Sequence, residues 1–514
     1  MRGLFINPRE YQKTIFESIK DVNSLVVLPT GTGKTLIAMM LSEYKFIKNP
    51  LKKVVILAPT RPLIEQHLNS FKKSFPEGWA DMQLFTGKTN ADNRKKVWRT
   101  AEFVFSTPQC ISNDIQKELY NLKDVSLLII DEAHRCLKNY SYNKIATRYK
   151  VQNDDGQILA LTASPGGDKK TIEDVCLNMN IKRVEVRTRE SPDVKPYLQE
   201  LDFEKIFVDF PNEFMEIKIL LDEIYNDKLN ELKERKILFG YANKVMLLKI
   251  QNRLMIELRK SNKDGNSMIG VSLCAQALKI SHAVELLETQ TISSFVEYMR
   301  ELYKQSSENQ SRAVKKITSD PRFSKAYSLA LNLGKEHPKL YELKEIIKNS
   351  FKENTNSKII IFAQFRETIN KIKEFLSDVS GAKPGIFVGQ AMKENTRGVK
   401  TGLKQKEQKE MVEKFKSGDI NILIATSIAE EGLDIPEVSL VIFYEPVPSA
   451  IRKIQRTGRT ARLAPGQLKV LITKATRDEV YYYSSYNKEK KMHKVIDDIQ
   501  KNGLNIDSQK QLTL

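Results

Sequence analysis

The stretch LPTGTGKT, residues 28–35, follows a short apolar run and places one proline and two glycines where a buried strand would end. A glycine-rich turn at that point lets backbone N–H groups face phosphate oxygens, and the helix after it adds the positive end of its dipole. Lys34 can then reach the β- and γ-phosphates, and Thr35 can bind Mg²⁺. The usual pattern begins with glycine, whereas this chain has Leu28. The residues expected to bind the nucleotide here are Pro29, Thr30, Gly31, Thr32, Gly33, Lys34 and Thr35.

Two adjacent carboxylates stand in the segment LLIIDEAH, residues 127–134. The four apolar residues before Asp131 indicate a strand, so both carboxylates lie at its carboxyl end rather than on a solvated helix. Asp131 can hold Mg²⁺ through water, and Glu132 can orient and deprotonate the attacking water. The sequence therefore predicts nucleotide hydrolysis, with Lys34, Asp131 and Glu132 as catalytic residues and with Thr35 and Asp131 at the metal.

A third cluster of chemistry-bearing residues lies near the other end of the chain, in QRTGRTAR, residues 455–462. Arginines at three-residue spacing can meet a γ-phosphate that a separate domain holds, and an arginine finger is worth about 10³–10⁵ in rate. Gln455, Arg459 and Arg462 are therefore added to the catalytic residues. If they come from another domain, the cleft must close around the nucleotide and reopen after hydrolysis.

Short apolar runs that alternate with helical patterns must position these residues. Runs without polar alternation suit parallel strands that are buried on both faces, with crossover helices between them. The runs of the first half predict an α/β domain over residues 1–205: 24–28, 53–58, 102–106, 126–131 and 157–162. A second α/β domain is predicted over residues 338–485 from four more runs: 358–363, 420–426, 439–444 and 468–473.

The region between these two domains has a different pattern of apolar residues. Apolar residues recur at three- and four-residue spacing, and proline is absent from residue 212 through residue 320. This pattern predicts an all-helical domain over residues 206–337. The last residues, 486–514, are expected to form a polar, basic tail.

Composition narrows the class of protein. The chain has 514 residues, a formal net charge of +19 and four cysteines, none of them in a CxxC pair. A basic surplus of this size favours a nucleic-acid partner, and scattered cysteines favour an intracellular location with reduced thiols. No run of about 18 apolar residues is present, so no membrane span is expected.

Nine segments in order resemble the motifs of a superfamily 2 helicase: REYQ (9–12), PTGTGKT (29–35), APTRPL (58–63), STPQ (106–109), DEAH (131–134), LTASP (161–165), IFAQFRET (361–368), ATSIAEEGLDIP (425–436) and QRTGRTAR (455–462). The helical block and GLKQKEQ (402–408) are similar to the archaeal Hef and FANCM branch. The resemblance implies two RecA-like domains with a thumb-like helical insert, ATP and Mg²⁺ as cofactors, and a nucleoid-associated cytoplasmic protein. One departure is Ala461, where motif VI often has glycine.

The resemblance also implies roles for individual residues. Arg9 and Gln12 would bind the adenine, and Gly432 and Asp434 would lie against the ribose and the γ-phosphate side of the nucleotide. Thr162 and Ser164 would link the ATP site to the nucleic-acid strand. The residues implied to touch the phosphates of that strand are Thr60, Arg61, Thr86, Gly87, Thr107, Gln364, Arg366, Gly389, Gln390 and Thr426.

The helical block has two readings: a spacer, or a duplex-gripping domain with a basic face. Basic residues with few acids between them favour the second: Arg312, Lys315, Lys316, Arg322, Lys325, Lys335 and Lys339. The final segment QKQLTL, residues 509–514, resembles the start of a sliding-clamp binding peptide but lacks its aromatic pair. Nothing after residue 485 resembles the nuclease or helix-hairpin-helix domains that some Hef-like chains carry.

Three functions are open at this point. The resemblance favours an ATP-driven motor on branched DNA, such as stalled forks and Holliday junctions, in DNA repair. A double-stranded RNA translocase of the RIG-I or Dicer type is the alternative. A binding scaffold with a decayed ATPase is disfavoured because Lys34, Asp131, Glu132 and the motif VI arginines are all present.

Overall fold

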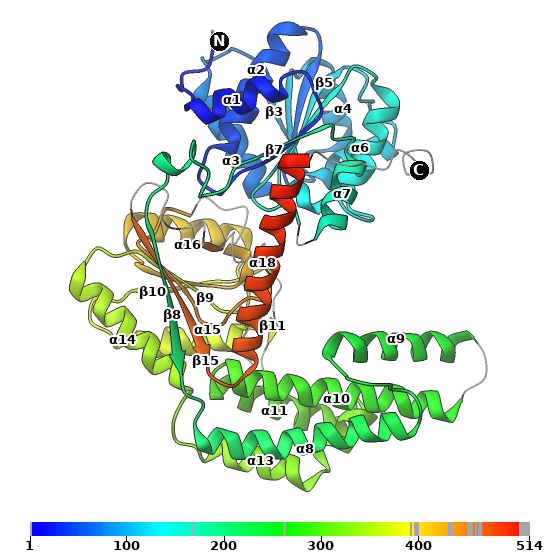
Figure 1. Cartoon of the computed structure of the whole chain (residues 1–514), viewed down its shortest axis with the longest axis vertical. Helices are drawn as coiled ribbons and strands as arrows, with labels where there is room; N and C mark the ends of the chain where they lie inside the picture. Colours follow the sequence, from blue (N-terminus) through cyan, green and yellow to red (C-terminus); the bar gives the residue numbers. More distant parts are fainter. Residues whose placement is uncertain are drawn as a thin grey trace.

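Three bodies make up the protein in this computed structural model (Figure 1). The described residues are 3–166, 168–260, 264–390, 393–394, 400–429, 435–449, 456–457, 460 and 465–502. An N-terminal α/β domain lies above a second, C-terminal α/β domain, and a helical insert lies below both in Figure 1. This arrangement confirms the predicted fold class of two parallel-sheet domains with a helical domain between them in the chain.

The N-terminal domain is built on a seven-stranded parallel sheet in the order β3-β4-β2-β5-β6-β1-β7. Its strands are β1 (Ser24–Val27), β2 (Lys53–Leu57), β3 (Met82–Phe85), β4 (Phe103–Ser106), β5 (Val125–Ile130), β6 (Gln157–Thr162) and β7 (Arg183–Val186). Successive residues of a strand point to opposite faces, so Leu25 and Val27 enter one core while Val26 and Leu28 enter the other. Both faces of the central strands are buried, which is why β1, β2, β4, β5 and β6 read as largely apolar runs.

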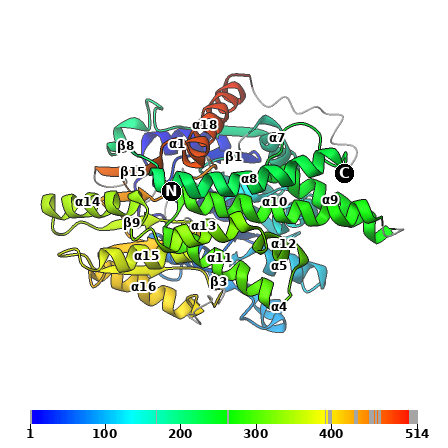
Figure 2. The same cartoon turned by 90° about the horizontal axis from the view of Figure 1, so that it is seen from below.

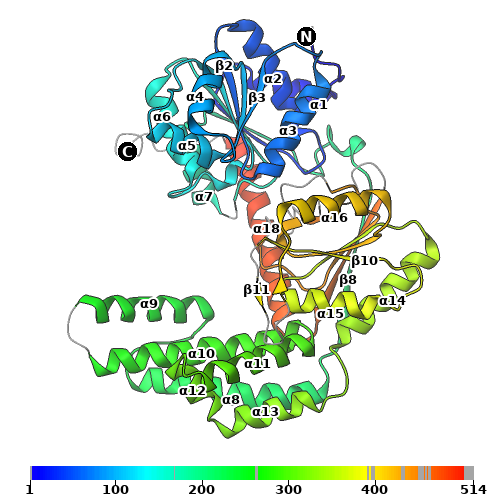
Figure 3. The same ribbon diagram turned by 180° about the vertical axis from the view of Figure 1, so that it is seen from behind.

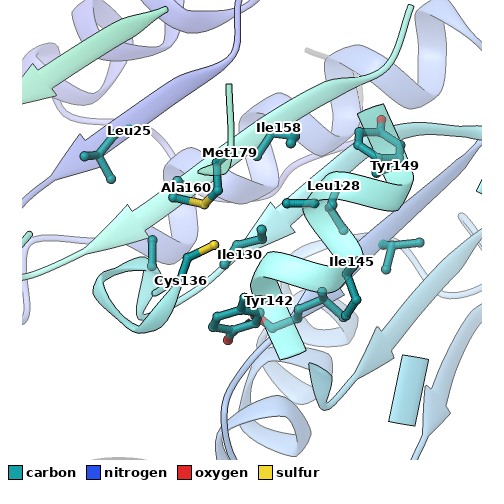
Figure 4. Packing of buried hydrophobic residues seen from close by; sticks show 14 of the residues in the cluster. Leu25, Leu128, Ile130, Cys136, Tyr142, Ile145, Tyr149, Ile158, Ala160 and Met179 are labelled. Atoms are coloured by element: carbon teal, nitrogen blue, oxygen red, sulfur yellow. Dashed lines mark hydrogen bonds between the residues drawn. The ribbon is translucent and has the colours of Figure 1, made fainter. Parts of the chain in front are cut away.

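Helices cover both faces of this sheet (Figure 1). They are α1 (Glu10–Ile19), α2 (Lys34–Lys48), α3 (Arg61–Ser74), α4 (Ala91–Thr100), α5 (Pro108–Gln116), α6 (Ser141–Gln152) and α7 (Lys169–Asn178). Figure 4 shows one of the two cores, in which Tyr142 and Ile145 of α6 pack against Leu128 and Ile130 of β5. The strands are thereby held rigidly, and their carboxyl ends form a fixed edge.

The C-terminal domain has a six-stranded parallel sheet in the order β10-β13-β9-β14-β15-β8. Its strands are β8 (Leu201–Val208), β9 (Ile359–Phe362), β10 (Pro384–Phe387), β13 (Ile422–Ala425), β14 (Leu440–Phe443) and β15 (Gly466–Thr473), and a two-stranded ribbon adds β11 (Lys393–Glu394) and β12 (Lys400–Thr401). Its helices include α14 (Pro338–Glu353), α15 (Arg366–Leu376) and α16 (Gln405–Ser417).

Strand β8 corrects the predicted boundary at residue 205. It pairs along its whole length with β15, from Leu201 opposite Gly466 to Val208 opposite Thr473, so it belongs to the C-terminal sheet. The strand lies at the sheet edge, where its mixed sequence LDFEKIFV is half exposed and gives no buried-strand signal. The chain therefore leaves the N-terminal domain before residue 201, crosses to the second sheet, and only then enters the insert.

The insert is a bundle of six helices: α8 (Asn212–Glu234), α9 (Lys244–Lys260), α10 (Gly265–Thr289), α11 (Ile292–Ser307), α12 (Arg312–Thr318) and α13 (Pro321–Leu331). Seen from below, these helices lie side by side beneath the two α/β domains (Figure 2). The bundle has its own apolar core, in which Ile217 and Leu221 of α8 meet Ile280 and Leu287 of α10.

The long helix α18 (Arg477–Asn502) corrects the second predicted boundary. The expected tail from residue 486 continues this helix through residue 502, and Met492 and Ile499 are buried in a core of the N-terminal domain. The segment that resembles a sliding-clamp peptide lies outside the described residues. Among the described residues, no helix has the length and apolar character that a bilayer crossing requires.

Candidate ATPase site and nucleic-acid interface

The phosphate-binding turn follows β1 and leads straight into α2. Gly31 and Gly33 have φ values of 81° and 84°, in the left-handed region that residues with a Cβ avoid. Gly33 caps α2, so the positive end of the helix dipole faces the turn. The Lys34 ammonium donates hydrogen bonds to the carbonyl oxygens of Leu28 at 3.0 Å and Pro29 at 3.3 Å, and thus lies over the loop it is expected to serve.

Residues of α1 hold this turn from the side. The Gln12 amide nitrogen and the Tyr11 hydroxyl both donate to the carbonyl of Thr32, at 3.0 Å and 2.5 Å. A Cβ added to Gly33 would lie 2.3 Å from the Gln12 amide nitrogen, so the glycine is required by close packing as well as by its φ. The turn is therefore a rigid cradle of backbone N–H groups beside a lysine, which fits the phosphates of ATP. The Arg9 guanidinium lies over the Tyr197 ring, 4.9 Å from its centroid, next to this cradle.

Asp131 follows the buried strand β5 and is itself buried. Its Oδ2 lies 2.7 Å from His67 Nε2, and its Oδ1 accepts a hydrogen bond from the Glu132 backbone N–H at 2.9 Å. Burial alone would raise the pKa of the Asp131 carboxyl, but the hydrogen bond from His67 and the charge of Lys34 lower it below its ordinary value. The group is therefore held as an oriented anion, which fits the requirement of a Mg²⁺ site that includes Thr35 at the start of α2.

A chain of polar contacts runs from Glu132 to the turn after β6, which carries Thr162 and Ser164. Glu132 has a left-handed φ of 51°, a conformation that costs a residue with a side chain about 1–3 kcal/mol. Its Oε2 lies 3.3 Å from His134 Nδ1, which is 3.1 Å from the Thr162 hydroxyl. Thr162 in turn donates to the Ser164 carbonyl at 2.8 Å. The candidate general base is thus connected to Thr162 and Ser164, the two residues expected to link the ATP site to the strand.

In the N-terminal domain, the predicted nucleotide-binding residues and the predicted strand-binding residues lie at the same edge of the sheet, in two adjacent groups of strand ends. The phosphate-binding turn, Asp131 and Thr162 lie at the carboxyl ends of β1, β5 and β6, which are neighbours in the sheet. The candidate strand-binding residues lie at the carboxyl ends of the other three neighbours: Thr60 and Arg61 after β2, Thr86 and Gly87 after β3, and Thr107 after β4. Arg61 Nε donates to Glu65 Oε1 at 2.6 Å, while Gly87 is exposed and has open space around it.

The C-terminal sheet repeats this layout. Gly389 and Gln390 follow β10, Thr426 follows β13, and Gln364 and Arg366 follow β9, and these three strands are again neighbours. The Arg366 guanidinium donates to the Gly389 carbonyl at 3.2 Å, which joins two of the predicted contacts directly.

Helices α3 and α16 bring the two strand-binding halves together. Lys409 of α16 forms an ion pair with Glu65 of α3 at 3.1 Å, beside a cleft of about 450 Å³ between the helices. Because Glu65 also binds Arg61, one contact links the two domains at the edge that carries the predicted phosphate-binding residues.

Comparison with known proteins assigns a family to each part of the chain. Residues 9–172 match the model for a DEAD/DEAH box helicase, and residues 338–464 match the helicase conserved C-terminal domain. Residues 213–337, the insert, match a model described as the helical bundle of a putative ATP-dependent RNA helicase.

The relatives cover nearly the whole chain. The solved structure of the Hef helicase domain from Pyrococcus furiosus is 43% identical, with a TM-score of 0.70 over 93% of this chain and 98% of that one. The chain belongs to the Hef and FANCM branch of the superfamily 2 helicases. A putative ATP-dependent RNA helicase of Methanocaldococcus jannaschii is 38% identical over 96% of this chain, and the ATP-dependent DNA helicase mph1 of Neurospora crassa is 33% identical over 92%. This helicase spans 61% and 41% of those two relatives.

Motif VI of this Hef-like helicase is described only in part. Arg456 is buried, with its guanidinium 4.8 Å from the ring centroid of Phe362 and 5.5 Å from that of Phe443. It is therefore anchored between β9 and β14 of the C-terminal sheet. The predicted site residues that lie outside the described residues are Gln455, Arg459, Arg462, Gly432 and Asp434.

His67 is the residue of this site that the sequence analysis missed. It is buried on α3 and contacts Asp131, although nothing in its local sequence distinguishes it from a packing histidine. The contact depends on β2 and β5 lying side by side in the sheet, which no local signal could have shown.

The predicted basic face of the insert is not formed as expected. Three of its basic side chains form ion pairs with acids of α8. Arg322 pairs with Asp227 at 2.7 Å, Lys335 with Glu213 at 2.6 Å, and Lys325 with Glu216 at 3.8 Å. Lys339 is fully buried against Asp478. Arg322, Lys325 and Lys335 are thus compensated by acids that stand far away in the sequence. Arg312, Lys315 and Lys316 of α12 are exposed and form no ion pair among the described residues, so the predicted positive charge is kept there only.

Proposed function

We propose that this helicase is an ATP-driven motor that moves along one strand of branched DNA. The observation that carries the proposal is the shared layout of the two sheets. In each sheet, the residues predicted to touch nucleic-acid phosphates occupy adjacent strand ends, and in the N-terminal sheet the predicted nucleotide residues occupy the ends of β5, β6 and β1 at the same edge. A change at the ATP site can therefore displace one set of phosphate contacts relative to the other.

The residues of the ATP site have distinct tasks in this proposal. Bound MgATP supplies the phosphoanhydride bond whose hydrolysis provides the free energy. Lys34 neutralises phosphate charge, Thr35 and Asp131 hold the metal, and Glu132 takes the proton of the attacking water. Arg9 and Gln12 bind the base, with Gly432 and Asp434 near the ribose and γ-phosphate. Gln455, Arg459 and Arg462 complete the site from the C-terminal domain when the cleft closes.

Contacts to the backbone rather than to bases suit a motor, because base-specific contacts would make it pause on particular sequences. The nucleic acid is taken to be DNA because the 43% identical structure is a Hef helicase domain and the mph1 relatives are named DNA helicases. The name of the Methanocaldococcus jannaschii relative favours RNA instead. A double-stranded RNA translocase is therefore the second candidate.

ATPase stimulation by different nucleic acids tests the proposal. Hydrolysis should be stimulated most by forked DNA, less by linear duplex DNA, and least by duplex RNA of the same sequence. Stimulation by RNA alone would overturn the proposal in favour of the second candidate. The rate should also fall steeply with salt, since phosphate contacts release counterions.

The Lys34→Ala variant is the control for this experiment. Loss of the ammonium should abolish hydrolysis on every nucleic acid, while fork binding, measured by fluorescence anisotropy without ATP, should remain close to that of the wild type. Residual turnover in this variant would show that the measured ATPase belongs to a contaminant.

A further inference from the structure

The connection between α8 and α9 displays two aromatic rings to solvent. Phe239 is 68% exposed and Tyr241 is 85% exposed. Between them, Gly240 has a left-handed φ of +73°, and an added Cβ there would have no atom within 4 Å. Two large aromatic side chains that are this exposed and only two positions apart are uncommon on a surface that serves only packing or solubility.

The rings are held in place although they are exposed. Leu238 and Ala242, on either side of the pair, are buried in the apolar cluster that joins α8, α9 and α10. The backbone N–H groups of Ile237 and Leu238 both donate to the Leu232 carbonyl, at 3.0 Å and 3.1 Å, and so close the end of α8. The turn therefore presents the two rings from an anchored base.

Helix α9 extends this surface. One of its faces packs on α10 through Leu247, Ile250 and Leu254. Another face is apolar but exposed, with Val245 61% and Ile256 51% accessible. In Figures 1 and 3, α9 lies on the side of α10 that is turned toward the N-terminal domain.

Charge identifies the kind of partner. Residues 235–260 contain seven basic residues and one acidic residue. Three of the seven pair with acids, Arg235 with Glu231, Lys244 with Glu285 and Arg253 with Glu257, but with only one acid of its own the segment keeps a net positive charge. A surface with apolar and aromatic side chains and a net positive charge is complementary to a nucleic acid with unstacked bases, because such bases expose apolar faces next to phosphates. A linear duplex offers the phosphates but keeps its base faces covered.

We propose that Phe239 and Tyr241 stack on unpaired bases at a DNA branch point, and that the surface of residues 235–260 is the part of the insert that distinguishes a fork from a linear duplex. This inference rests on the proposed function and adds the residues that read the branch. Stacking on an aromatic ring is insensitive to base identity, so it is compatible with a motor that must act on any sequence.

The test compares the Phe239→Ala/Tyr241→Ala variant with the wild type on two DNAs. Affinity for a fork should fall on the order of tenfold or more, while affinity for a linear duplex of equal length should stay within about twofold. A 2-aminopurine placed at the unpaired branch base should be quenched by the wild type and remain bright with the variant. The substitutions are at exposed positions, so an unchanged melting curve verifies the fold.

Two further variants sharpen the result. Phe239→Trp should retain the quenching, because it keeps a ring. Phe5→Ala removes a phenylalanine of matched exposure, 69%, from the N-terminal domain and should change neither affinity. Retained fork preference in the double alanine variant, or an equal loss on both DNAs, would overturn the inference. If no DNA stimulates the wild-type ATPase, the proposed function fails instead, so the two failures are distinguishable.

Discussion

At the scale of single residues, His67 is the side chain whose contact most directly affects the chemistry. It holds Asp131 Oδ2 at 2.7 Å, inside the protein, and so fixes the direction of the carboxylate that is expected to hold Mg²⁺. Removing a side chain that hydrogen-bonds to a metal ligand and orients it commonly lowers metal affinity or activity by about 10–100-fold.

We therefore predict that His67→Ala raises the Mg²⁺ concentration needed for half-maximal ATPase activity by about tenfold or more. The reason is that Asp131 loses the donor that sets its rotamer. Activity titrated with Mg²⁺ at saturating ATP measures this, and His67→Gln, whose amide can still donate, should recover part of the affinity. An unchanged Mg²⁺ requirement in His67→Ala would assign the histidine to packing alone.

His67 also shows how far the sequence leads at this scale. Lys34 and Asp131 were identified because glycines and apolar runs around them constrain what they can do, and their roles in hydrolysis stay predictions. His67 lies 64 residues from Asp131 in the chain and meets it only because β2 and β5 pair in the sheet. A contact made through strand order leaves no local pattern to read.

At the scale of elements, a buried polar junction joins the insert to the C-terminal domain. The ends of α10 and β14 and the starts of α14 and α18 meet there. Lys339 pairs with Asp478, both fully buried, and the Gln290 amide donates to Glu445 Oε2 at 3.4 Å. Among the described residues, Glu445 Oε1 has no hydrogen-bond partner. The insert and the C-terminal sheet are therefore expected to move as one body.

Glu445 makes this junction sensitive to pH. Burial raises the pKa of its carboxyl from 4.5 to about 7, despite the opposing charges of Arg456 and Lys339. The folded chain thus keeps a proton that the unfolded chain releases near pH 4.5. Stability from this group is fully present below pH 4.5 and is lost as the pH rises to about 7, by up to about 3 kcal/mol.

We predict that Glu445→Gln raises the melting temperature at pH 8 and leaves it nearly unchanged at pH 4.5. Glutamine keeps the size of the side chain and mimics the protonated form, so it removes the cost of the buried charge. Thermal unfolding at both pH values measures the effect, and Glu437→Gln, which replaces a neighbouring glutamate in the same domain, is the control. A lower melting temperature at pH 8 would mean that the carboxylate is needed for the ion pairs around it.

The elements themselves were predictable to different degrees. Buried central strands such as β5 and β13 were found from their apolar runs, because a parallel strand covered on both faces has no polar alternation. The four edge strands of the two large sheets, β3, β7, β8 and β10, were missed. The exposed positions of β7 and β8 carry charged residues, and β3 and β10 are short and only half buried. The basic face of the insert was misread at Arg322, Lys325 and Lys335, because the compensating acids lie on α8, about a hundred residues earlier in the chain, and meet them only after the bundle is formed.

At the scale of the whole molecule, α18 touches all three bodies, through α10, β15 and β7. It has 26 residues and is therefore about 39 Å long. Its start is bound to α10, where the Arg477 backbone N–H donates to Glu288 at 3.3 Å. Tyr482 packs in the core of the C-terminal domain. Its other end is buried in the N-terminal domain through Met492, whose sulfur accepts a hydrogen bond from Ser164 at 3.0 Å.

This last contact links α18 to catalysis. Ser164 is joined through Thr162 and His134 to Glu132, the candidate general base. Met492 of α18 is thus joined to Glu132 through four contacts, while the start of α18 is fixed to the insert that is proposed to read the DNA branch. A helix is stiff over this length, so displacement of the insert reaches the ATP site without passing through the cleft itself.

We predict that Met492→Ala/Ile499→Ala releases α18 from the N-terminal domain and lowers DNA-stimulated hydrolysis several-fold more than hydrolysis without DNA. Each truncation of a buried side chain costs about 2–5 kcal/mol. Here it removes the contacts through which α18 docks on the core of the N-terminal domain. Tyr483→Ala, at a 51% exposed position of the same helix, is the matched control and should leave both rates unchanged.

The spatial consequence of the same release is measurable by single-molecule energy transfer between dyes on the two α/β domains. The four native cysteines are buried, and burial raises the thiol pKa of Cys136 and Cys176 to about 12, so dyes attach selectively at an introduced pair such as Leu51→Cys and Glu374→Cys. The distance distribution should broaden in Met492→Ala/Ile499→Ala and stay narrow in Tyr483→Ala. Should the distribution stay narrow while stimulation is lost, α18 would act on Ser164 alone and would not set the angle between the domains.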